Sequence, residues 1–151
     1  MQSIQGDLIR LALNKEFDVI VHGCNCQCVM GAGIAKTIKT VFPEAYVTDC
    51  QTKKGDRSKL GNISTATVIR DNHEITVVNA YTQFHWRGKG VKVDYRALAS
   101  CFQKIKTQFS GKRIGYPLIG AGLAGGDWSI IATIIDEELA GEDHTLVEFK
   151  P

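Results

Sequence analysis

The chain has 151 residues, of which 44% are hydrophobic and only three are proline, a size and composition typical of one globular domain with its own core. Eighteen basic and sixteen acidic residues leave a formal net charge of +2, too small to indicate a nucleic-acid or membrane partner. The longest apolar runs are far shorter than a membrane span, and the N-terminus has no signal-peptide pattern. Because the five cysteines are an odd number, we expect reduced thiols and a cytoplasmic protein.

The first half of the chain predicts strands and helices in alternation. Residues 3–5 and 17–22 are typical of strands, and the second strand is apolar on both faces, which indicates a central strand covered by helices on both sides. Helical spacing predicts one helix over 34–42, and Pro43 suits the first position of a second helix over 43–52. Residues 53–59 are expected to form a solvated loop. Strands over 61–70 and 74–81, joined at Asp71-Asn72, predict an antiparallel hairpin.

The second half continues this alternation. Residues 85–92 (HWRGKGVK) predict a mobile loop, and a helix follows over 94–108. Residues 113–119 are expected to be a buried strand, 127–139 a helix and 145–149 the last strand. We therefore expect one domain over residues 1–151, a three-layer α/β/α sandwich around a mixed central sheet of about six strands.

Two glycine-rich stretches each follow a predicted buried strand and enter a helix. Glycine lets the backbone approach a ligand, and the free N–H groups and dipole of a helix N-terminus favour an anion without any lysine. Either stretch alone is compatible with a tight turn, but the pair predicts a clamp for a diphosphate. The pattern Gly120-x-Gly122-x-x-Gly125 matches the dinucleotide fingerprint, yet Asp143 precedes a strand rather than ending one, which excludes a Rossmann dehydrogenase.

Several motifs spread over the whole chain point to one family. They are Gly6-Asp7-Leu8, His22-Gly23-Cys24-Asn25, Met30-Gly31-Ala32-Gly33-Ile34, Tyr116-Pro117 and the stretch from Ile119 to Trp128 (IGAGLAGGDW). Together they resemble the macro domain, the ADP-ribose-binding fold. The branch that the chain resembles most holds ADP-ribose 1″-phosphate phosphatases, including phage-encoded ones, and enzymes that remove terminal ADP-ribose from glutamate.

The resemblance implies a ligand site built from both glycine stretches. Asp7 would accept from the adenine amino group, the backbone at Leu8 would contact the ring, and Asn25 would bind the distal ribose. Both polar residues also have structural interpretations, Asp7 as the N-cap of a helix over 8–13 and Asn25 as a turn residue. The other expected substrate-binding residues are Met30, Gly31, Ala32, Gly33, Ile34, Thr82, Gly120, Ala121, Gly122, Leu123, Ala124 and Gly125.

His22 and Asp127 are the expected catalytic pair. The related phosphatases carry a histidine at the position of His22, and an ordinary imidazole pKa suits proton transfer near neutrality, although a lone histidine is often structural. Asp127 begins a helix, so it can cap that helix and still act on the distal ribose only if its second oxygen is free. No metal or cofactor is expected, because Cys24-x-Cys26-x-Cys28 lacks zinc spacing and is interpreted as small buried apolar residues.

One departure from the family narrows the expected chemistry. The glutamate-deconjugating enzymes use a lysine and an aspartate where this chain has Gln83 and Ala124, which argues against a covalent lysine route. We therefore expect a monomeric, cytoplasmic enzyme (host cytoplasm if phage-encoded) that hydrolyses ADP-ribose 1″-phosphate, without nucleic-acid or membrane partners. Two alternatives stay open: hydrolysis of an ADP-ribosyl or O-acetyl-ADP-ribose ester at the same carbon, and a non-catalytic ADP-ribose reader.

Overall fold

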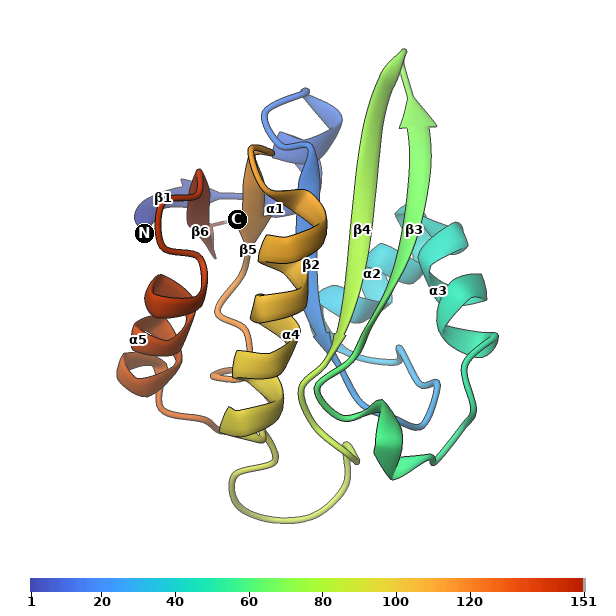
Figure 1. Cartoon of the computed structure of the whole chain (residues 1–151). Coiled ribbons are helices and arrows are strands. Elements are labelled where there is room, and N and C mark those ends of the chain that lie inside the picture. Colours follow the sequence, from blue (N-terminus) through green and yellow to red (C-terminus); the bar gives the residue numbers. More distant parts are fainter. Residues whose placement is uncertain (151) are drawn as a thin grey trace.

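A mixed six-stranded sheet organises the computed structural model, which describes residues 1–150. The strand order is β1-β6-β5-β2-β4-β3, and only the β3–β4 pairing is antiparallel (Figure 1). The carboxyl ends of five strands therefore meet at one edge. The strands are β1 (Gln2–Gly6), β2 (Val19–Cys24), β3 (Ile63–Arg70), β4 (His73–Tyr81), β5 (Ile114–Tyr116) and β6 (His144–Phe149).

Helices cover both faces of the sheet, which confirms the three-layer α/β/α prediction. Three helices pack on one face around the cluster that contains Ile20, and two pack on the other around the cluster that contains Val19 and Val21. The first group is α1 (Leu8–Leu13), α2 (Gly33–Val41) and α3 (Pro43–Cys50), and the second is α4 (Tyr95–Phe109) and α5 (Trp128–Glu138). A short 3₁₀ helix, η1 (Arg57–Lys59), precedes β3.

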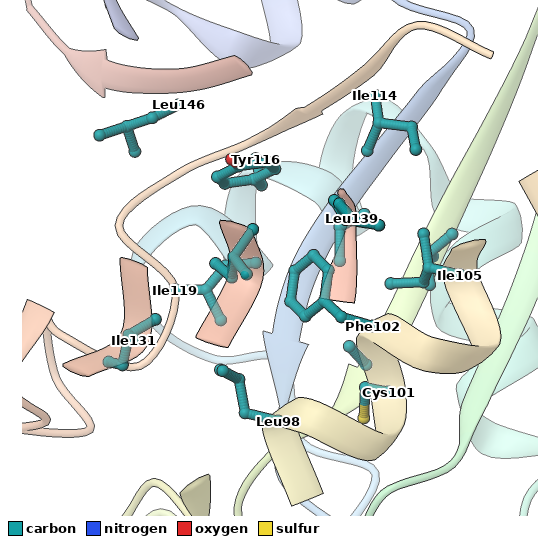
Figure 2. Packing of buried hydrophobic residues seen from close by; sticks show 14 of the residues in the cluster. Leu98, Cys101, Phe102, Ile105, Ile114, Tyr116, Ile119, Ile131, Leu139 and Leu146 are labelled. Carbon is teal, nitrogen blue, oxygen red and sulfur yellow. The ribbon is translucent and has the colours of Figure 1, made fainter. Parts of the chain in front are cut away.

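The core below α4 and α5 is built from large apolar side chains (Figure 2). Phe102 and Tyr116 are fully buried and meet edge to face, with ring centroids 5.9 Å apart. Burial of one such side chain contributes about 1.5–3 kcal/mol to folding. This packing holds β5 and α4 beneath the loop that leaves β5.

The predicted hairpin turn is confirmed, because Asp71 and Asn72 both have positive φ (52° and 61°) and connect paired residues Arg70 and His73. The predicted strand over 113–119 is too long. It ends at Tyr116, since Pro117 has no N–H to donate to a neighbouring strand.

The prediction that residues 53–59 form a solvated loop is wrong for Lys59. This side chain is 7% exposed; its ammonium donates to the Cys26 carbonyl (3.2 Å) and lies 4.7 Å from the centroid of the Tyr81 ring. Hydrogen bonding and the aromatic face compensate the buried charge. Among residues 1–150, no helix has the length and apolar character needed to cross a bilayer.

Candidate functional site

The candidate site lies at the carboxyl edge of the sheet, where β2 and β5 are neighbours. The connection from β2 leads toward the β4–β3 side of the sheet, and the connection from β5 leads to the β6–β1 side. Ligands of open α/β sheets bind at such a switch point. Two loops leave the sheet here, the first glycine loop (residues 25–32) after β2 and the second glycine loop (residues 117–126) after β5.

Hydrogen bonds within the first glycine loop fix its shape. Asn25 accepts from the Gln27 amide through Oδ1 and donates to the Val29 carbonyl through Nδ2, both at 2.9 Å. The Cys26 amide donates to the Phe84 carbonyl (3.0 Å) and so joins this loop to the segment after β4. Asn25 therefore shapes the loop and keeps one amide hydrogen and one lone pair for a ligand.

The first glycine loop leads into α2, a helix whose N-terminus has no side-chain cap. Ala32, the N-cap residue of α2, offers no side-chain hydrogen bond, whereas Asp7, Asp94 and Asp127 cap α1, α4 and α5. Within residues 1–150, the amides of Gly33 and Ile34 have no acceptor. These free donors and the helix dipole make the start of α2 a suitable place for an anion.

The second glycine loop presents further free amides. Its own bonds run from the Gly125 amide to the Gly122 carbonyl (3.1 Å) and from the Gly126 amide to the Gly120 carbonyl (2.7 Å). In the described part of the chain, the consecutive amides of Gly122, Leu123 and Ala124 donate to nothing. Successive unpaired N–H groups of this kind form an anion-binding concavity.

The two glycine loops face each other across a short distance. Leu123 is 75% exposed, and its Cδ1 lies 3.6 Å from the position that a methyl group on Gly33 would occupy. Gly33 itself has a positive φ of 59°. The start of α2 and the tip of the second glycine loop, which both carry free amides, are therefore neighbours.

Gly122 is a glycine that the surrounding protein does not require. A methyl group there would meet no other atom within 4 Å, and its φ lies outside the left-handed region. At Gly126, in contrast, the same methyl group would lie 2.5 Å from Val93 Cγ1 and 2.6 Å from the Gly120 carbonyl oxygen. Glycine at this position would let a ligand approach the backbone closely.

Asp127 caps α5 with one carboxylate oxygen only. Oδ1 accepts from the Ser129 amide (2.9 Å) and the Ser129 hydroxyl (2.7 Å), and these bonds lower the pKa of the Asp127 carboxyl below its usual range. Oδ2 has no partner among residues 1–150. Asp127 is exposed at the end of the second glycine loop, so its second oxygen is free to act on a ligand.

Asp7 lies at the other end of the same sheet edge. Its Oδ1 accepts from the Arg10 amide (3.1 Å) and caps α1, while the Leu8 side chain is buried. Phe149, which the sequence analysis missed, pairs with Gly6 in the β1–β6 ladder and is 73% exposed. In the sequence, Phe149 could have been noticed as an aromatic residue between Glu148 and Lys150 at the end of the last strand.

The side chain of His22 is enclosed on one face of β2, and the neighbouring residue Gly23 faces the other side. It is fully buried, and its Nε2 donates to Asn79 Oδ1 at 2.6 Å, since the Asn79 amide group donates to the Ala45 carbonyl and to Ser64 Oγ. Burial lowers the pKa of His22 to about 4, so the ring is neutral near pH 7. Its catalytic role stays a prediction, and its contacts lie within the core.

The remaining predicted residues near the first glycine loop and β4 have distinct surroundings. Met30 is 2% exposed and packs with Cys24, Cys26 and Tyr81, so only its backbone can face a ligand. The burial of Cys24 and Cys26 confirms their interpretation as small apolar residues, whereas Cys28 is only half-buried and its thiol donates to the Asp49 carbonyl (3.3 Å). Thr82 is 1% exposed, and its hydroxyl oxygen is the one buried side-chain polar atom among residues 1–150 without a hydrogen-bond partner.

A loop with aromatic and cationic residues, the cationic loop (residues 85–92), borders the second glycine loop. The Lys92 amide donates to the Ala124 carbonyl (2.7 Å), and the Arg87 guanidinium lies 4.5 Å from the Trp86 ring centroid. Trp86, Arg87 and Lys89 are exposed. Gln83 donates from Nε2 to the His85 carbonyl (3.1 Å).

Comparisons with known proteins agree with this fold. A phage T4 protein from the tk–vs intergenic region, of 17.5 kDa and itself uncharacterised, is 35% identical over 98% of this chain and 96% of its own length. A DNA ADP-ribosyl glycohydrolase of Mycobacterium tuberculosis is 27% identical over 82% of the chain, which spans only 34% of that enzyme. The solved structure of Thermosipho africanus DarTG in complex with ADP-ribose has 20% identity and a TM-score of 0.74 over 99% of this chain and 41% of its own.

The family model described as the Macro domain matches residues 21–135, from β2 through the second glycine loop and most of α5. This segment contains both glycine loops, Asn25, Thr82 and Asp127. This match covers well over half of the chain. In addition, the T4 relative is similar to the chain over almost the full length of both proteins. The chain therefore belongs to the macro domain family.

Proposed function

We propose that the protein binds ADP-ribose and hydrolyses a bond at the anomeric carbon of its terminal ribose. The observation that carries this proposal is the pair of glycine loops, which bring free amides onto neighbouring segments without a lysine or arginine in either loop. A diphosphate matches this arrangement because backbone N–H groups and a helix N-terminus compensate its charge. Two similar proteins, a DNA ADP-ribosyl glycohydrolase and a DarTG protein solved in complex with ADP-ribose, support the same ligand and a hydrolytic role.

The order of groups along the sheet edge orients the ligand. We place the adenine near Asp7 and the exposed Phe149 ring, the diphosphate against the free amides of α2 and of the second glycine loop, and the terminal ribose near Asn25 and Asp127. The Asp7 carboxylate would accept from the adenine amino group, and an aromatic ring next to it can stack on the base. The reacting carbon then lies near the free Oδ2 of Asp127.

The finer proposal is that the substrate is ADP-ribose 1″-phosphate. One water molecule is consumed, the phosphate ester at the anomeric carbon breaks, and ADP-ribose and inorganic phosphate leave. Asp127, which is ionised near neutral pH, accepts the proton of the attacking water through Oδ2. Because His22 contacts Asn79 within the core, we assign it a positioning role, in which its ring supports β2 just before Gly23 and Asn25.

The decisive experiment compares three substrates at equal enzyme concentration. Purified protein is incubated with ADP-ribose 1″-phosphate, O-acetyl-ADP-ribose or an ADP-ribosylated glutamate peptide, and phosphate release and free ADP-ribose are measured. Phosphate release above that of the Asp127→Ala variant supports the phosphatase. Turnover of an ester alone contradicts it and favours the first alternative, whereas calorimetric binding of ADP-ribose without any turnover favours a reader.

A second candidate function is removal of ADP-ribose from nucleic acid, contrary to the expectation of no nucleic-acid partner. The cationic loop favours it, because an exposed aromatic ring with neighbouring cations can stack on a base and contact phosphates. The relatives named DNA ADP-ribosyl glycohydrolases give the same indication. An Arg87→Glu/Lys89→Glu variant should lose turnover of an ADP-ribosylated oligonucleotide while keeping turnover of ADP-ribose 1″-phosphate; equal effects on both would count against this function.

A further inference from the structure

We propose that Thr82 is the specificity-determining residue for the terminal ribose. Its hydroxyl, which has no hydrogen-bond partner in the protein, forms a hydrogen bond with that ribose. This proposal rests on the proposed ADP-ribose site and adds a residue that selects ADP-ribose over ADP. Its starting point is the unpartnered hydroxyl of Thr82 within a residue that is 1% exposed. Buried polar side chains normally have a partner, so this exception needs a cause.

The backbone of Thr82 is held firmly, so the hydroxyl has a defined place. The Thr82 amide donates to the Cys24 carbonyl (3.2 Å), and its carbonyl accepts from the Asp94 amide (2.7 Å). The first bond attaches the residue, which directly follows β4, to the carboxyl end of β2, and the second attaches it to the N-cap residue of α4. Since Thr82 contacts the residue before Asn25, its hydroxyl lies next to the segment proposed to bind the terminal ribose.

The buried hydroxyl lies beside Gly23, near the start of the second glycine loop. A methyl group on Gly23 would lie 2.9 Å from Thr82 Oγ1 and 3.4 Å from Ile119 Cγ2, so Gly23 separates the hydroxyl from the start of the second glycine loop. At this level β5 has already ended at Tyr116 and no longer pairs with β2. Glycine at position 23 leaves no side chain between the hydroxyl and the start of the second glycine loop.

The chemistry of this position favours a sugar hydroxyl over a phosphate. A threonine hydroxyl donates one hydrogen bond and accepts others, as a ribose hydroxyl does. Val21, Ala80 and Ile119 belong to the apolar cluster below it, so it sits where a neutral partner is preferred. The free amides of Gly122, Leu123, Ala124 and Gly33 lie in the loops themselves and suit the diphosphate.

The test measures the binding of two ligands that differ only in the terminal ribose. Calorimetry with ADP-ribose and with ADP is carried out on the wild-type protein, Thr82→Val and Thr82→Ser. We expect Thr82→Val to weaken ADP-ribose binding about tenfold, the effect of one lost hydrogen bond, and to leave ADP binding unchanged. Thr82→Ser keeps the hydroxyl and should bind both ligands within about twofold of wild type.

A buried threonine whose hydroxyl has a partner provides the matched control. Thr145 is 5% exposed at the amino end of β6, and its Oγ1 donates to Gln2 Oε1 (3.4 Å). Thr145→Val should bind both ligands as wild type does. Thermal denaturation adds a second readout, since loss of the unpartnered hydroxyl should leave the Tm of ligand-free Thr82→Val unchanged or higher, unlike that of Thr145→Val.

Two results would overturn the role of Thr82 without affecting the proposed site. Unchanged ADP-ribose binding by Thr82→Val means that the hydroxyl holds a structural water, and equal losses for ADP and ADP-ribose mean that it supports the loops generally. If Thr82→Val does not fold, Thr82→Ala is measured against the same criteria. Failure of the wild-type protein to bind ADP-ribose at all would instead overturn the proposed function.

Discussion

Asp127 is the side chain whose proposed role depends most on a single atom. Oδ1 is occupied by the Ser129 amide and hydroxyl, and Oδ2 is free. If Oδ2 accepts a proton in the reaction, Asp127→Asn keeps a cap at α5 and loses the base, so we expect kcat to fall by about 10²- to 10⁴-fold with little loss of stability. Asp127→Ala should lose the cap as well, at about 0.5–2 kcal/mol of unfolding free energy.

Phosphate release and Tm, measured on the same two preparations, separate these contributions. A reduced Tm with full turnover in Asp127→Ala would limit Asp127 to capping. Equal losses of turnover in both variants, with a lower Tm only for alanine, are the result expected from the geometry.

His22 makes the stability of the protein depend on pH. Its pKa is lowered to about 4 in the folded chain and is near 6.5 when unfolded, so below pH 6.5 the unfolded state binds more protons. The stability is therefore fully present above pH 6.5 and falls as the pH decreases toward 4, by about 3 kcal/mol in total.

Urea denaturation at several pH values between 4 and 7 measures this loss. His22→Gln should give a flatter curve than wild type over that range. His144, whose pKa burial also lowers, and Asp49, whose pKa burial raises, are present in both proteins, so the difference between the curves reports His22. Parallel curves would show that His22 is protonated in the folded state or that the substitution has altered its surroundings.

At the scale of single elements, the second glycine loop contains glycines that are explained in two different ways, by the proposed ligand binding at Gly122 and by close packing at Gly126. Gly122→Ala places a methyl group in open space, so we expect unchanged or slightly higher stability, by up to about 1 kcal/mol, together with weaker ADP-ribose binding. Gly126→Ala forces a contact with Val93 and should lower the Tm markedly.

Calorimetry with ADP-ribose and thermal denaturation of both variants provide the measurements. The glycine-loop model requires that Gly122→Ala weakens binding without lowering Tm. If it binds ADP-ribose as wild type does, the backbone at Gly122 is not in contact with the diphosphate.

At the scale of the whole molecule, ligand binding should stabilise the fold, because the site joins loops that follow separate strands. ADP-ribose at about 100 times its Kd adds about 2.7 kcal/mol, which corresponds to a Tm increase of about 5–11 °C for a protein of this size. Adenosine alone, which lacks the diphosphate, should give a much smaller shift at the same concentration. Differential scanning fluorimetry tests this, and equal shifts for the two ligands would argue against the diphosphate clamp.

Much of the fold followed from local sequence patterns. Helical spacing located α2, α4 and α5 to within about two residues, and Pro43, Pro117 and the Asp71-Asn72 turn mark where elements begin or end. The glycine loops were also predicted, since a buried strand followed by glycines and a helix is a local pattern. The capping of helices by Asp7 and Asp127 is local as well, because each bond spans two or three residues.

The sequence by itself thus determined the elements, the glycine loops and the family resemblance, because these depend on neighbouring residues. Only the tertiary structure decided which side chains reach the site. His22 is bound by Asn79, which in turn donates to the Ala45 carbonyl of α3. Lys59 is enclosed by Cys26 and Tyr81, and β6 brings Phe149 next to Asp7. The unpartnered hydroxyl of Thr82 likewise depends on which atoms β2 and the second glycine loop place around it. These contacts join residues far apart in the chain, and burial and hydrogen-bond satisfaction are properties of the packed molecule rather than of a local pattern.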